Sequence, residues 1–202
     1  MNTVISLITP ETFTVSQWSG GVTTQVAIAP SDAQYANRDF LWRISSATVN
    51  LSESDFTPLP NYKRYISLLE GSMVLTHDGG NAIVLSPGEI HCFDGAAATK
   101  SQGTCVDFNL MLRKGKCDGT LSCLKMTAAG EYPLVSPAQS GIVPQPQTAV
   151  LYCVQGRGTI KAGNQVVSCA RGEAAHIQVL APDISLVCNE PAIFMAAFIH
   201  CC

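Results

Sequence analysis

Residues 62–93 read YKRYISLLEGSMVLTHDGGNAIVLSPGEIHCF, and this stretch decides the fold. Its first apolar, β-prone run stops at Gly71, and residues 78–81 (DGGN) have the composition of a hairpin turn. Pro87 then breaks the chain before another strand begins. Short strands separated by turns at this spacing are typical of a β-sandwich or β-barrel and not of a βαβ fold.

The C-terminal half contains a second copy of this pattern. Residues 150–177 read VLYCVQGRGTIKAGNQVVSCARGEAAHI and align with residues 65–91. The glycine after the first strand, the hairpin turn and the Gly-Glu turn recur at matching places, where a turn must reach positive φ. Two unrelated hairpins could also look alike, but the order of the matches favours a duplicated barrel in which each copy closes its own sheet.

The duplication predicts two parts in a chain of 202 residues. We expect an N-terminal barrel over residues 1–132, which would hold any ligand pocket, and a C-terminal half over residues 133–202. Residues 133–146 contain four prolines and are the best linker candidate. The two parts are expected to pack as one compact unit with strand exchange. No helix of any length is expected.

Composition excludes several classes of partner. Hydrophobic residues make up 47% of the chain and charged residues only 13%, which indicates a well-buried core. The net charge of −3 makes nucleic acid and anionic membranes poor partners. No apolar run approaches the ~20 residues of a membrane helix, and the N-terminus lacks the features of a signal peptide. The expected location is therefore the cytoplasm, and the low charge together with exposed strand edges makes a homodimer plausible.

The chain has nine cysteines, which are scattered and form no Cys-x-x-Cys pair. Most lie in apolar strands, so we expect buried free thiols in a reducing compartment. The odd number argues against a full disulfide framework. Cys201 and Cys202 are interpreted as an exposed, oxidisable pair or as a frayed tail.

Polar residues interrupt several of the predicted strands. Arg43 lies inside the apolar run 40–47, and Arg64 opens the strand that follows. Alternation places Asp107 and Asn109 on one face of the strand 105–111. An arginine in such a strand either reaches solvent or sits in a cavity with an acidic partner.

Residues 62–93 resemble a cupin, because the Glu-Gly strand end, the Asp-Gly hairpin and the Pro-Gly-Glu turn follow that family's order. The resemblance implies jelly-roll (double-stranded β-helix) barrels and, with the repeat, an all-β duplicated cupin or bicupin. In a metal cupin two histidines and a carboxylate would precede the Leu-Leu-Glu-Gly segment, where this chain has Tyr62, Lys63 and Arg64. Only His91 occupies a place where the second cupin motif often puts a ligand, so no metal and no cofactor are predicted.

The whole chain resembles the HutD/Ves family of bacterial bicupins, in which one branch is associated with histidine-utilisation genes and another with stress-induced Ves proteins. The resemblance covers the first two-thirds of the chain, and the last third matches only as a generic cupin half. The chain departs from the family pattern at Gln25, where an acidic residue is frequent, and at Asn61 or Tyr62, where a glycine is frequent. The matching blocks, in family order, are Trp18 with Gly20-Gly21 and Thr23-Thr24, Trp42-Arg43-Ile44-Ser45, Arg64 before Leu68-Leu69-Glu70-Gly71, Phe93, and Asp107-Phe108-Asn109-Leu110-Met111.

The resemblance implies a polar pocket in the N-terminal barrel. The planar forks of Arg43 and Arg64 suit a carboxylate, and two together could hold a dicarboxylate or an acyl-amino acid. Asp107 and Asn109 could orient the arginines or bind an amide. The alternative is a structural Arg–Asp network that only holds strands together. The candidate ligand-binding residues are Trp18, Thr23, Gln25, Arg43, Arg64, Asp107 and Asn109.

Three functions remain open. The leading hypothesis is a non-enzymatic cytoplasmic protein that binds a small anionic metabolite and regulates histidine utilisation or a stress response. For the histidine-utilisation branch, the resemblance implies a formylated or imidazole-derived acid as the ligand. The alternative is a metal-independent isomerase, epimerase or lyase with Asp107 or His91 as general base. The third is a metal-dependent cupin that uses His91 with non-standard partners. No residue is assigned a catalytic role.

Overall fold

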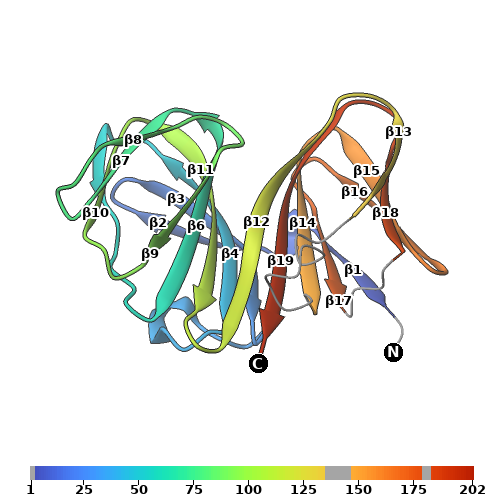
Figure 1. Cartoon of the computed structure of the whole chain (residues 1–202), viewed down its shortest axis with the longest axis horizontal. Helices are drawn as coiled ribbons and strands as arrows, with labels where there is room; N and C mark the ends of the chain where they lie inside the picture. Colours follow the sequence, from blue (N-terminus) through green and yellow to red (C-terminus); the bar gives the residue numbers. More distant parts are fainter. Residues whose placement is uncertain (1–2, 135–146, 179–182) are drawn as a thin grey trace. The chain divides into compact units, whose positions relative to one another are not determined.

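The computed structural model describes residues 3–134, 147–178 and 183–202, and in these residues the chain is almost entirely β-strand (Figure 1). The helical segments of the described residues are two short 3-10 helices, Pro10–Thr12 and Tyr35–Asn37. The predicted all-β fold class is therefore confirmed. None of the described helices is long and apolar enough to cross a membrane.

The chain divides into two compact units, which are described here one at a time. One unit is Phe13–Cys117, and the other combines Met1–Thr12 with Asp118–Cys202. The predicted boundary at residues 132 and 133 differs from this division. The physical reason is strand pairing, because β1 (Val4–Ile8) pairs with β17 (Ala174–Gln178) and β12 (Cys117–Met126) belongs to the same sheet. Of the predicted linker, Pro133 ends β13 (Gly130–Pro133), and residues 135–146 lie outside the described residues.

The unit Phe13–Cys117 consists of two antiparallel sheets. The strand order is β2-β3-β4-β11-β6-β9 in the six-stranded sheet and β5-β10-β7-β8 in the four-stranded sheet. The apolar side chains between them form a core that includes Ile66, Leu75 and Phe93. The strands are β2 (Thr14–Trp18), β3 (Gly21–Ala29), β4 (Trp42–Val49), β5 (Glu53–Asp55), β6 (Tyr62–Gly71), β7 (Met73–His77), β8 (Ile83–Leu85), β9 (Ile90–Asp94), β10 (Thr99–Gln102) and β11 (Cys105–Arg113).

The second unit repeats this arrangement. Its sheets have the orders β1-β17-β14-β19-β12 and β13-β18-β15-β16. The series β17-β14-β19-β12 corresponds to β9-β6-β11-β4, and β13-β18-β15-β16 corresponds to β5-β10-β7-β8, so the predicted duplication is confirmed. Its remaining strands are β14 (Thr148–Gln155), β15 (Arg157–Ala162), β16 (Gln165–Ala170), β18 (Ile184–Cys188) and β19 (Ala192–Cys201).

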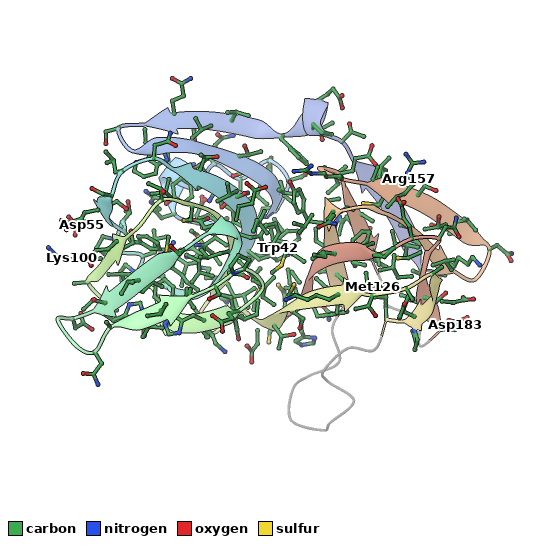
Figure 2. The ribbon with its side chains drawn as sticks, turned by 90° about the horizontal axis from the view of Figure 1, so that it is seen from above. Trp42, Asp55, Lys100, Met126, Arg157 and Asp183 are labelled. Atoms are coloured by element: carbon green, nitrogen blue, oxygen red, sulfur yellow. The ribbon has the colours of Figure 1, made fainter. Side chains whose placement is uncertain are left out.

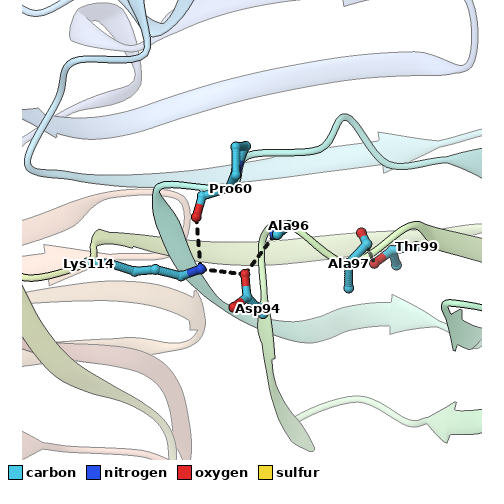
Figure 3. Close-up of polar contacts among 6 residues, drawn as sticks. All are labelled: Pro60, Asp94, Ala96, Ala97, Thr99 and Lys114. Carbon is cyan, nitrogen blue, oxygen red and sulfur yellow. Dashed lines mark hydrogen bonds and ion pairs between the residues drawn. The ribbon is translucent and has the colours of Figure 1, made fainter.

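Polar contacts tie the loops of the first unit to its strands. In the turn after β11, Lys114 Nζ donates to Asp94 Oδ1 at 2.5 Å and to the Pro60 carbonyl at 2.8 Å (Figure 3). These bonds link the end of β9 with the segment before β6. On the surface, Lys100 and Asp55 face each other across β10 and β5 at 3.8 Å (Figure 2). Both of these side chains are exposed, so their ion pair contributes little to stability.

The cysteines differ in part from the prediction. Seven thiols are free, and Cys105, Cys153, Cys169 and Cys188 among them are buried as expected. Cys117 and Cys201, in contrast, are disulfide-bonded. Cys201 was interpreted as part of an oxidisable pair with Cys202 or of a frayed tail, but Cys202 is a free thiol. No Cys-x-x-Cys spacing in the sequence marks either disulfide-bonded residue.

Candidate functional site

Three adjacent strands of the six-stranded sheet position the polar residues of the candidate site. Met111 on β11 pairs with Arg43 on β4 and with Arg64 on β6, so both arginines lie in one row across the sheet. Asn109 and Asp107 precede Met111 on β11 by two and four residues. Since side chains alternate along a strand, all five point to the same face.

This face borders a cavity of about 280 Å³ within the unit Phe13–Cys117. Six of the seven predicted ligand-binding residues line it, namely Trp18, Thr23, Arg43, Arg64, Asp107 and Asn109. The seventh, Gln25, is not among the lining residues but holds Arg43. The structure therefore brings the predicted residues together, while ligand binding itself stays a prediction.

Arg43 is fixed from several sides and is only 4% exposed. Its Nε donates to Gln25 Oε1 at 2.7 Å, and its Nη1 donates to Ser45 Oγ at 2.9 Å. The guanidinium carbon lies 4.3 Å from the centre of the Tyr35 ring, which Arg38 also contacts at 3.8 Å. Burial lowers the pKa of Arg43 to about 10, so the side chain remains charged at neutral pH.

Arg64 is buried to a similar degree but is bound differently. Its guanidinium carbon lies 4.9 Å from the centre of the Phe56 ring and 5.1 Å from that of Phe93. Its Nε is buried and has no hydrogen-bond partner. Within the described part of the chain, no carboxylate lies within ion-pair distance of Arg43 or Arg64. Burial lowers the pKa of Arg64 to about 10, so a charged donor faces the cavity unpaired.

Asp107 carries the buried acidic group of the cavity. Burial raises the pKa of its carboxyl group to about 7, against the opposing effects of Arg64, the Ala47 backbone amide and Arg43. The charge of the cavity therefore changes close to neutral pH. Ser46 Oγ donates to the Asp107 backbone carbonyl at 2.7 Å and fixes the strand at this point.

Asn109 adds an unused acceptor, because its buried Oδ1 has no hydrogen-bond partner. A buried polar atom without a partner costs about 1–3 kcal/mol relative to a satisfied one. Arg64 and Asn109 thus line the cavity, and each has one buried polar atom without a hydrogen-bond partner, Arg64 Nε and Asn109 Oδ1.

Sequence reasoning missed two aromatic residues of the cavity wall. Tyr35 lies in the 3-10 helix Tyr35–Asn37, and Phe56 directly follows β5. Both lie outside the strands that the sequence analysis used to place candidate residues. The available signal was a single aromatic residue in each otherwise polar segment, which is too weak to identify a contact with a distant arginine.

The residues present do not fit the metal site of a metal cupin. Tyr62 uses its hydroxyl to donate to the Phe40 carbonyl at 2.9 Å, and Arg64 places a cation where a ligand would be needed. No group of three His, Cys, Asp or Glu side chains suited to a metal occurs in the residues that the structure describes. The cavity is instead lined by two buried guanidinium groups, those of Arg43 and Arg64.

Comparison with known proteins finds one matching family model and solved structures with a similar fold. The family model HutD matches residues 10–194. No curated protein matches. A conserved protein of unknown function from Pseudomonas aeruginosa PAO1 is similar in structure, with a TM-score of 0.80 and 22% identity over 97% of this chain and 98% of that one.

Two further solved structures have the same fold. HutD from Pseudomonas fluorescens SBW25, determined in a formate condition, has a TM-score of 0.73 and 20% identity over 98% of this chain and 100% of that one. A cupin 2 conserved barrel domain protein from Leptotrichia buccalis has a TM-score of 0.56 and 11% identity over 92% and 91%. These identities support the fold alone.

Proposed function

The chain belongs to the HutD family, and from this premise we propose that it is a non-enzymatic protein that binds a small carboxylate in the cavity of the unit Phe13–Cys117. The observation that carries the proposal is the unpaired guanidinium of Arg64, buried between two phenyl rings. A buried charge without a counterion is costly, and a bound anion would remove that cost.

The absence of an ion pair argues against the structural alternative. A network that only joined strands would place a carboxylate against each guanidinium. In the described residues neither Arg43 nor Arg64 has one within 4.0 Å, and the carboxyl group of Asp107 is partly protonated near neutral pH. Among the buried lining residues, two guanidinium groups face one partly protonated carboxyl group, and the other lining carboxylate, Asp55, is 78% exposed, so the buried part of the cavity favours a negatively charged ligand.

The two polar atoms without hydrogen-bond partners indicate which chemical groups a ligand would carry. Arg64 Nε calls for an acceptor such as a carboxylate oxygen, and Asn109 Oδ1 calls for an N–H or O–H donor. A cavity of about 280 Å³ suits a small metabolite. An acyl-amino acid or an imidazole-bearing acid has both groups. The formate condition of the P. fluorescens HutD structure makes formate a further ligand to test.

The proposed biological role is regulation of histidine utilisation or of a stress response, as the family's branches suggest. We propose a cytoplasmic location and, because β2 is an edge strand with all five residues exposed, a homodimer. The disulfide bonding of Cys117 and Cys201 runs against a reducing compartment, where disulfides are rare.

The test is a thermal-shift and calorimetric titration with formate, glutamate, formylglutamate and urocanate. We expect at least one acid to raise Tm in the wild type and to lose that effect in Arg64→Met. Removing one partner of a buried charged contact costs about 2–5 kcal/mol of binding free energy. Arg157→Met replaces an exposed arginine of the other unit and is the matched control (Figure 2).

The apo Tm separates binding from folding in this experiment. Since Arg64 is an uncompensated buried cation, Arg64→Met should keep or raise the apo Tm while it abolishes the ligand effect. A stabilising acid that still binds Arg64→Met with wild-type affinity would disprove the proposed site. No stabilisation by any acid would favour a purely structural role for the arginines.

One observation favours a second candidate function, a metal-independent isomerase, epimerase or lyase. The pKa of Asp107 is raised to about 7, which is the range that suits a general acid or base, and two guanidinium groups could stabilise an enediolate. NMR of the bound acid after long incubation distinguishes the two. Conversion that Asp107→Asn abolishes would establish an enzyme, whereas recovery of the unchanged acid supports the binding protein.

A further inference from the structure

The wall of the cavity in the unit Phe13–Cys117 changes its charge along the strands of the six-stranded sheet. Arg43 and Arg64 lie in one row with Met111. The next row towards the start of β11 contains Asn109, and the row after it contains Asp107. All four polar side chains line the cavity. Along the sheet, the wall therefore runs from two cations past a neutral amide to a carboxyl group.

The carboxyl group of Asp107 is held apart from the two guanidinium groups. Asp107 precedes Met111 by four residues, which corresponds to about 13 Å along a strand at ~3.3 Å per residue. The arginine side chains shorten this gap, but in the described part of the chain neither Arg43 nor Arg64 has a carboxylate within 4.0 Å. All three side chains are nearly buried, with 4–6% exposed. Opposite charges that are buried but not paired favour a ligand that carries both signs of charge.

An aromatic side chain lies beyond Asp107 in the same direction. Trp18 lines the cavity, and its row contains Gly21 and Val49, whose partner on β11 is two residues before Asp107. Trp18 is 39% exposed, so this part of the wall is open to solvent. The face of an indole ring attracts cations. Trp18 and Asp107 therefore both favour a positively charged group at the side of the cavity away from the arginines.

The other titratable groups of the cavity wall do not neutralise Asp107. They are Tyr35 in the 3-10 helix, Arg43 on β4, Asp55 on β5 and Arg64 on β6, and Cys105 precedes Asp107 on β11. The thiol of Cys105 is neutral, because burial raises its pKa to about 12. The side chain of Asp55 is 78% exposed and adds no cation. Burial thus raises the pKa of Asp107 to about 7 in spite of the arginines, and a cation beside it would favour the carboxylate.

Resting on the proposed carboxylate site, we propose that the ligand is an amino acid, whose carboxylate binds at Arg43 and Arg64 and whose ammonium group binds beside Asp107. A dicarboxylate would place a second anion against the Asp107 carboxyl group, and a monocarboxylate would leave that group without a counterion. Asp107 is therefore the residue that selects zwitterions over other small acids.

The test compares acids of equal length that differ only in the group far from the carboxylate. Calorimetric titration of the full chain at pH 7.0 uses ω-amino acids of three to five carbons and the corresponding monocarboxylic and dicarboxylic acids. We expect at least one amino acid to bind roughly tenfold or more tightly than both of its counterparts. In Asp107→Asn this preference should vanish while the monocarboxylic acid still binds. Asp183→Asn changes an exposed carboxylate of the other unit and is the matched control (Figure 2).

Proton exchange on binding gives a second readout, which a merely structural Asp107 would not change. Titrations in MOPS and in Tris, which differ in ionisation enthalpy, measure the protons that are taken up or released. Because Asp107 is partly protonated in the empty cavity at pH 7.0, a neighbouring ammonium group should release part of a proton. A dicarboxylate should instead cause proton uptake. Asp107→Asn should abolish the proton release.

The outcomes separate this inference from the proposed function. Arg64-dependent binding in which a mono- or dicarboxylic acid equals or exceeds every amino acid would overturn the inference and leave the carboxylate site intact. A preference for the amino acid that survives unchanged in Asp107→Asn would overturn the role of Asp107. Failure of every acid to bind the wild type would overturn both proposals.

Discussion

Asp107 carries a carboxyl group that is buried in a cavity together with two guanidinium groups. Burial favours the neutral acid, and Arg64, the Ala47 amide and Arg43 favour the carboxylate. Burial prevails, and the resulting pKa of about 7 means that the folded protein holds a proton which the unfolded chain releases near pH 4. The free energy of unfolding of the protein therefore depends on pH through the protonation of Asp107.

The sign of this linkage gives a prediction for Asp107→Asn. The contribution of the proton is fully present below about pH 4 and is lost as the pH rises towards and through 7. Wild type should therefore lose stability relative to Asp107→Asn between these values, by up to about 4 kcal/mol if the whole shift is realised. Urea unfolding of both proteins at pH 4.5, 6 and 8 measures the difference.

The surface variant Asp55→Asn serves as the control for the same pH series, because the side chain of Asp55 is 78% exposed. A constant difference between wild type and Asp107→Asn from pH 4.5 to 8 would contradict the raised pKa. It would indicate that the arginines keep the carboxylate ionised throughout the range.

The strands that begin each copy end in the same way, with a glycine in the left-handed region. Gly71 is the last residue of β6 and has φ of 84°, and Gly156 follows β14 with φ of 77°. A Cβ at Gly71 would meet the Thr104 carbonyl oxygen at 2.5 Å, so the turn needs glycine for space as well as for conformation. At Gly172, with φ of 85°, a Cβ would meet nothing within 4 Å.

This contrast predicts unequal costs for two similar substitutions. Gly172→Ala only places a side chain in the left-handed backbone conformation, which should lower the free energy of unfolding by about 1–2 kcal/mol. Gly71→Ala adds a backbone clash and should cost about 3 kcal/mol or more. Calorimetric unfolding of both variants measures the two costs. Equal costs for the two variants would show that the turn at Gly71 moves away from Thr104 easily. The close approach of the Thr104 carbonyl oxygen would then not be a reason for glycine at this position.

For the molecule as a whole, local signals made the fold predictable. The alternation of apolar and polar residues and the glycines at turns are local features of the sequence, and they identified the strands and the duplication. The boundary of the units was not predictable in this way, because it depends on a pairing that joins Val4 to Gln178. No local pattern records which edge strand completes a sheet so far along the chain.

The candidate site was predictable to the extent that it lies on strands. Arg43 and Arg64 were identified because a charge inside an apolar strand needs an explanation, and alternation placed Asp107 and Asn109 beside them. The contribution of Phe56 was missed since it comes from a segment between strands. The contact of His77 with His91 was likewise not predicted, because it joins two different sheets.

The cysteines provide a prediction about the whole chain. Because Cys117 and Cys201 are disulfide-bonded and the other seven thiols are free, alkylation of the denatured, unreduced protein should modify seven cysteines, and prior reduction should raise this to nine. Denaturation is required, because four of the free thiols are buried and protected in the folded state. Peptide mass spectrometry identifies the two protected residues. Nine modified cysteines without reductant, in protein purified under non-reducing conditions, would contradict the disulfide and would agree with a reducing location.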